Sequence, residues 1–148
     1  MRPVITALSV LLVAFSTLAA AQDERQFTYT VVFEDQQGVT HFREEQLRWQ
    51  TSQTTQLGNM PALLTPYLDA QKIGFVRLHA GYDADWHPAP SKRFVIVLSG
   101  TGEIEVGDGE RRALAAGGVV LVTDTQGRGH RTSAVGNQDV LIAWVPVP

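Results

Sequence analysis

The chain has 148 residues, of which 44% are hydrophobic and 18% charged, with a net charge of −3 and no cysteine. This composition fits one globular domain with a buried core, and it excludes a disordered tail and a protein stabilised by disulfides. Lysine and arginine form no long run, which argues against nucleic acid as a partner.

Residues 1–21 have the three parts of a secretory signal peptide. Arg2 supplies a basic start, an uncharged apolar run extends to about Leu18, and three alanines end at Ala21. We expect cleavage after Ala21, which gives a mature protein that is secreted, or periplasmic in a host with two membranes, and has no membrane contact. A membrane anchor is the alternative, but the apolar run is short for the ~20 residues that a span needs.

The mature chain begins with two predicted strands. Residues 27–35 are rich in β-branched and aromatic side chains and predict the first strand. Residues 40–50 alternate between apolar and polar, with Phe42, Leu47 and Trp49 marking a buried face. Part of this second run also contains good helix formers, so a helix remains an alternative there.

The rest of the chain predicts an arm followed by a series of strands. Residues 51–61 are polar and predict a loop, and residues 62–71 predict a helical turn or an extended arm. Further strands are expected at 73–79, 93–99, 103–106, 117–125, 129–135 and 139–147, with a hairpin turn at 108–109. This pattern predicts a single all-β domain, a sandwich or barrel rather than a βαβ fold, with N-terminal strands and an arm in 22–72 and the barrel core in 73–148.

Two segments of the core carry histidines in a recurrent spacing. In the first segment Gly81 is followed after five residues by His87, and Gly100 ends the segment, while Ala89 and Arg93 lie between them. This arrangement resembles the first motif of the cupin superfamily, G-x5-H-x-H-x3,4-E-x6-G. Ala89 stands where the motif has its second histidine, and Arg93 stands where it has a glutamate.

The second segment, GGVVLVTDTQGRGHRTSA, resembles the second cupin motif, G-x5-P-x-G-x2-H-x3-N. Gly127 and His130 match it, and Gly118 approximates its first glycine with one extra residue. Thr125 replaces the proline and Ala134 replaces the asparagine. We expect Gly100 of the first motif and Gly127 to adopt positive φ angles at tight turns.

The resemblance implies a cupin-type double-stranded β-helix, or jelly-roll barrel. It also implies that His87 and His130 project from neighbouring strands into the mouth of the barrel, where small molecules commonly bind. Cupins often pair through strands, so the resemblance suggests a homodimer. It indicates no particular substrate, because cupin chemistry varies while the barrel persists.

One hypothesis places a divalent metal ion between His87 and His130. The usual cupin site uses three histidines and a glutamate, of which only these two positions remain. A guanidinium at Arg93 would repel a cation instead of binding it. A different third ligand would then be needed, and the candidates in the sequence are Asp124, Asp85, Asp83 and His79.

The alternative hypothesis is a metal-free site for a small anion. Arg93 would bind a carboxylate or phosphate with two parallel hydrogen bonds. His130 would act as a general acid or base with Asp124 orienting it, and His87 is the second catalytic candidate. Trp86 and Arg128 are further candidates for contacting the ligand. Both an enzyme and a binding or sensing module remain open.

Overall fold

The computed structural model describes residues 27–53, 61–65, 67–70 and 72–148. Its secondary structure in those ranges consists of strands, and none of the described residues forms a helix that could cross a membrane. The strands are β1 (Thr28–Glu34), β2 (Thr40–Gln46), β3 (Gln50–Gln53), β4 (Pro61–Leu64), β5 (Gly74–Leu78), β6 (Arg93–Ser99), β7 (Thr101–Glu105), β8 (Arg111–Ala115), β9 (Val119–Val122), β10 (Arg131–Ala134) and β11 (Val140–Pro146). The predicted signal peptide lies outside the described residues.

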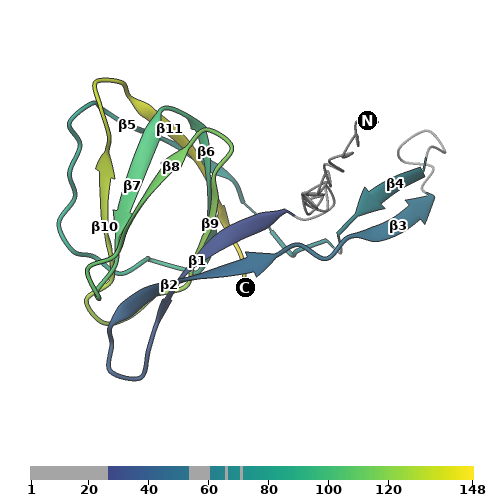
Figure 1. Ribbon diagram of the computed structural model, residues 1–148, viewed down its shortest axis with the longest axis horizontal. Coiled ribbons are helices and arrows are strands. Elements are labelled where there is room, and N and C mark those ends of the chain that lie inside the picture. The colour runs from purple at the N-terminus through teal and green to yellow at the C-terminus, as the bar shows by residue number, and fades with distance from the viewer. Residues whose placement is uncertain (1–26, 54–60, 66, 71) are drawn as a thin grey trace, which may run out of the picture.

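Two sheets face each other and form the barrel (Figure 1). The larger sheet has the strand order β2-β1-β9-β6-β11-β5, and the smaller has the order β10-β7-β8. Neighbouring strands are antiparallel except for β1 and β9, which are parallel. The predicted all-β jelly-roll class is therefore confirmed.

In the segment before the barrel core, one prediction is confirmed and one is wrong. Residues 40–46 form strand β2, as the alternation predicts, and not the alternative helix, because pairing with β1 along its whole length outweighs the helix propensity of the glutamates. The predicted loop at 51–61 instead begins in β3 and ends in β4, which pair with each other in a hairpin that projects away from the barrel (Figure 1). The connecting residues 54–60 lie outside the described residues.

One predicted core residue is also misplaced. Phe42 packs against the core as expected, but Trp49 lies beyond the end of β2 and is 38% exposed. The alternation that places Phe42 inward applies only while the chain remains in the strand. Because β2 ends at Gln46, the pattern no longer decides the direction of Trp49.

The barrel interior is lined by alternate residues of each strand. On β6, Arg93, Val95 and Val97 share one face, because successive strand residues point to opposite sides of a sheet. Aliphatic side chains form two buried clusters, one around Val120 and Val122 of β9 and the other around Val97 and its neighbours on β5 and β11. Arg93 therefore enters the interior on the same face as two core valines.

Two glycines make the turns that the motifs predict. Gly100, between β6 and β7, has a φ of 76°, and Gly127, in the loop between β9 and β10, has a φ of 62°. A Cβ on Gly100 would also lie 2.5 Å from the carbonyl oxygen of Asp139. The positive φ expected at both positions is confirmed, and at Gly100 the close approach of the backbone adds a second reason for glycine.

Candidate functional site

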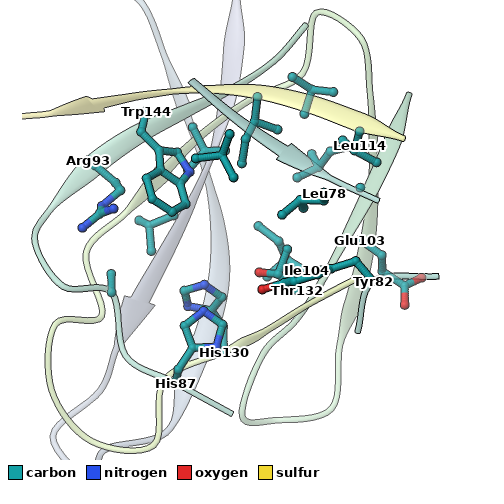
Figure 2. A pocket seen from close by; sticks show the side chains of 18 of the residues that line it. Leu78, Tyr82, His87, Arg93, Glu103, Ile104, Leu114, His130, Thr132 and Trp144 are labelled. Carbon is teal, nitrogen blue, oxygen red and sulfur yellow. The ribbon is translucent and has the colours of Figure 1, made fainter. Parts of the chain in front are cut away.

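The backbone itself brings His87 and His130 together. Each residue donates its N–H to the other's carbonyl oxygen, with both N–O distances equal to 3.0 Å. In an antiparallel bridge of this kind the two side chains lie on the same face. The centres of the two imidazole rings are consequently 4.8 Å apart (Figure 2).

Hydrogen bonds fix which nitrogen of each ring carries a proton. Nδ1 of His87 lies 2.7 Å from the carbonyl oxygen of Asp85, and Nδ1 of His130 lies 2.7 Å from Oδ2 of Asp124. A carbonyl oxygen and a carboxylate can only accept, so each Nδ1 donates. In the neutral rings, Nε2 then has a free lone pair, and neither Nε2 is bonded to another described residue.

Asp124 is completely buried at the end of β9. Its Oδ2 accepts the hydrogen bond from His130, while its Oδ1 has no hydrogen-bond partner among the described residues. A buried carboxylate is costly unless it is paired, so its retention next to a histidine indicates a positioning role. The hydrogen bond from His130 Nδ1 to Asp124 holds the His130 ring in one tautomer and one orientation, while a catalytic role for Asp124 stays a prediction.

A cavity of about 160 Å³ opens inside the barrel beside the two histidines (Figure 2). His87 and His130 form one part of its wall, and Arg93 and Trp144 form another. Most of the remaining wall is aliphatic and comes from facing strands of the two sheets. The site thus combines a small number of polar groups with an apolar chamber, as small-molecule sites usually do.

Arg93 is the cationic side chain of this wall, and it is only 8% exposed. Its Nε donates to the carbonyl oxygen of Ser91 at 3.0 Å, its Nη2 donates to Ser91 Oγ at 3.2 Å, and its guanidinium lies 4.9 Å from the ring centre of Trp144. No carboxylate of a described residue forms an ion pair with it. Burial lowers the pKa of Arg93 from its ordinary value, but arginine stays charged in proteins.

Trp144 is the site residue that sequence reasoning missed. Its ring lies against the Arg93 guanidinium, and both side chains line the cavity. The pairing of β11 with β6 brings the two residues together. Trp144 lies opposite Val95, and Arg93 is two residues before Val95 on the same face of β6. The signal available in the sequence was the alternation of β11, which places Trp144 on the same face as Ile142 and Val140.

The remaining predicted ligands of a metal do not converge on the histidines. The Asp85 side chain accepts from the Trp86 N–H, Asp83 pairs with Arg131, and His79 lies 3.4 Å from Asp139. Among the described residues there is no group of three side chains that could hold a metal ion. The two imidazoles alone fall short of the three or four protein ligands that a resident divalent metal usually has, and the Arg93 guanidinium cannot serve as a ligand.

Trp86 and Arg128 lie together beside the cavity, not in its lining. The Arg128 guanidinium is 3.8 Å from the ring centre of Trp86, a cation–π contact between the two loops that precede β6 and β10. Neither residue is among those that line the cavity. A direct role for them in ligand contact stays a prediction.

One family model matches this chain, and several solved structures are similar to it. The model of the Cupin_2 family, the cupin domain, matches residues 74–146. Structures similar to this chain include a cupin-2 domain protein from Shewanella frigidimarina (19% identity, TM-score 0.42, covering 64% of this chain and 90% of that one) and an RmlC-like cupin from Desulfovibrio desulfuricans (15% identity, TM-score 0.38, covering 92% and 98%). A third is the Cnp3 cupin domain of Schizosaccharomyces pombe (16% identity, TM-score 0.41, covering 84% and 86%).

A search of curated proteins found no match. The family match spans β5 to β11, which includes both histidine segments and every strand that lines the cavity described above. The two-layered all-β architecture is the one that the motifs imply. The chain belongs to the cupin superfamily.

Proposed function

We propose that this protein binds a small anionic molecule inside the cupin barrel, with Arg93 holding the negative charge. The observation that supports this most strongly is a guanidinium, nine-tenths buried in a cavity wall, that has no carboxylate partner among the described residues. Buried charges in proteins are normally paired, so an unpaired one facing a cavity fits a ligand of opposite charge.

The surroundings of Arg93 suit this role. Ser91 and Trp144 hold the guanidinium through one of its edges and one of its faces, which fixes its direction before a ligand arrives. A preorganised planar fork binds a carboxylate with two short, charge-assisted hydrogen bonds. An apolar cavity strengthens such bonds because little water competes for them.

A second candidate function is proton transfer on the bound anion. The observation that favours it is the Asp124–His130 pair, whose Nδ1–Oδ2 distance is 2.7 Å and which leaves Nε2 of His130 as an acceptor. A general base must be oriented and must have a free lone pair, and His130 satisfies both conditions. Replacing Asp124 with asparagine should leave anion affinity within a few-fold while it removes any turnover, because the orientation of His130 is lost.

Titration calorimetry with acetate and benzoate tests the binding function. We expect Arg93→Gln to weaken the affinity for benzoate at least tenfold, about 1.4 kcal/mol, since one charge-assisted bidentate contact is lost. The affinity of Arg93→Lys for benzoate should lie between those of wild type and Arg93→Gln, because lysine keeps the charge but cannot form two parallel hydrogen bonds. Arg77→Gln is the matched control, since the side chain of Arg77 is 63% exposed on β5 and does not line the cavity. Equal affinities for wild type and Arg93→Gln would reject the proposal.

We propose in addition that the protein acts outside the cytoplasm. The basic start, the apolar run and the alanines that end at Ala21 support this. N-terminal sequencing of protein from the native host should begin at Gln22. Protein that retains Met1 would contradict export by this route.

A further inference from the structure

The cavity wall is mostly aliphatic and carries few polar side chains. In Figure 2, Arg93 lies at the left beside Trp144, His87 and His130 lie at the bottom, and Leu78 and Leu114 lie at the upper right. The aliphatic part also includes Val97, Ile104, Val140 and Ile142, contributed by both sheets. A ligand that fills this space must therefore have a charged end and an apolar body.

The volume of the cavity limits the size of that body. An apolar cavity of about 150 Å³ is large enough to hold benzene. The cavity here measures about 160 Å³, so a six-membered ring or a branched chain of about six carbons fills most of it. The carboxylate attached to that body would then extend to Arg93 in the cavity wall.

The charge of the wall limits the ligand to one negative charge. Arg93 has no carboxylate partner in the part of the chain that the structure describes, and the lining carboxylate Glu103 pairs with Arg111 on the outside of the barrel. A second negative charge on the ligand would have no partner and would lose its hydration. This disfavours dicarboxylates and dianionic phosphate esters.

The scarcity of polar atoms excludes a further class of ligand. Apart from the groups already named, the hydroxyls that line the cavity belong to Tyr82 and Thr132. A sugar acid would bury several hydroxyl groups against aliphatic side chains, and each one left without a hydrogen bond lowers affinity. A polyhydroxylated ligand is therefore a poor match for this wall.

We infer that the ligand is a monocarboxylic acid with a compact apolar body of about the size of benzoate. This inference rests on the anion-binding function proposed above and adds the chemical class. The carboxylate pairs with Arg93, and the ring or branched chain packs against the aliphatic side chains around Val97. The two Nε2 atoms of the histidines accept a hydrogen bond from water or from a single hydroxyl on the ligand.

The experiment is a calorimetric comparison of probes that share one ring. We expect benzoate to bind at least tenfold more tightly than phthalate, phenyl phosphate and benzyl alcohol, which add a second charge or remove the only one. Gluconate should bind at least tenfold more weakly than benzoate as well. Acetate serves as the minimal anion. Its affinities for wild type and for Arg93→Gln show how far binding of the carboxylate alone depends on Arg93.

A change to the apolar wall gives a second readout. Val97→Ala removes two methyl groups from a side chain that is 3% exposed and lines the cavity. We expect this variant to improve the affinity for 4-ethylbenzoate relative to benzoate by at least fivefold. Val135→Ala is the matched control, because Val135 is 42% exposed, and it should leave this ratio unchanged.

The outcomes separate the two levels of the proposal. If phthalate, phenyl phosphate or gluconate binds as tightly as benzoate and depends on Arg93, the ligand class is wrong while anion binding stands. If Val97→Ala leaves the ratio of 4-ethylbenzoate to benzoate unchanged, the placement of the apolar body is wrong. If benzyl alcohol binds as tightly as benzoate, or if Arg93→Gln weakens the binding of no anion, the proposed function itself fails.

Discussion

Replacing Gly129 with alanine should separate the two histidines and destabilise the protein. Gly129 precedes His130 and has a φ of 79°. A Cβ at this position would lie 2.0 Å from the carbonyl oxygen of His87 and 2.4 Å from the nitrogen of Pro88. Both are backbone atoms, so the contact is relieved only if the two segments move apart and the hydrogen bonds between His87 and His130 lengthen.

The size of the effect follows from two contributions. A non-glycine residue in the left-handed region costs about 1–2 kcal/mol. Forcing the backbone apart adds about 1–3 kcal/mol, the usual range for overpacking. Gly136→Ala isolates the first contribution, since Gly136 has a φ of 85° and nothing lies within 4 Å of its Cβ position.

Urea denaturation followed by tryptophan fluorescence measures both variants. We expect Gly136→Ala to lower the free energy of unfolding by about 1–2 kcal/mol and Gly129→Ala by about 2–5 kcal/mol. The benzoate affinity should fall in Gly129→Ala alone. If the two variants lose equal stability, the close approach of the two histidine segments is not the constraint that the structure indicates.

Two other predictions concern stability. Arg93→Met should raise the free energy of unfolding of the ligand-free protein by about 1–2 kcal/mol, because it removes a buried charge that has no carboxylate partner among the described residues. The same variant should abolish anion binding. A loss of stability would show that Arg93 is structural. His41 lies between Asp35 and Asp108, which raise its pKa above the ordinary value of 6.5, so its contribution is complete below pH 6.5 and is lost as the pH rises through the raised pKa. The pKa values of Asp35 and Asp108 are lowered, chiefly by backbone hydrogen bonds, so their contributions are lost only in acid. The melting temperature should therefore fall less between pH 5.5 and pH 8.5 in His41→Gln than in wild type, and an equal fall in both would contradict this reading.

Much of the barrel was predictable because alternation and turns are local signals. Strands such as residues 93–99 show the period of two directly, and the glycines at positions 100 and 127 mark turns that need positive φ. The β3–β4 hairpin was not predictable, because the β3 sequence Gln-Thr-Ser-Gln has no apolar alternation to distinguish it from a loop.

The candidate site was predictable in part: the sequence identified His87, His130 and Arg93, but not Trp144 or the contacts within the site. The cupin spacing identified His87 and His130, and the structure places their rings side by side. The contact between Arg93 and Trp144 depends on the register of β6 and β11, which are far apart in the chain, and no local pattern specifies that register. The same holds for Arg93, because the sequence does not show that no carboxylate among the described residues pairs with it.

A crystal structure of the protein soaked in benzoate tests the central claim most directly. The account predicts that benzoate lies in the barrel cavity, with its carboxylate oxygens about 2.7–2.9 Å from the nitrogens of Arg93 and its ring against the aliphatic wall. The claim is contradicted if the cavity remains without benzoate at saturating concentration, or if Arg93 is instead paired with a carboxylate of the protein.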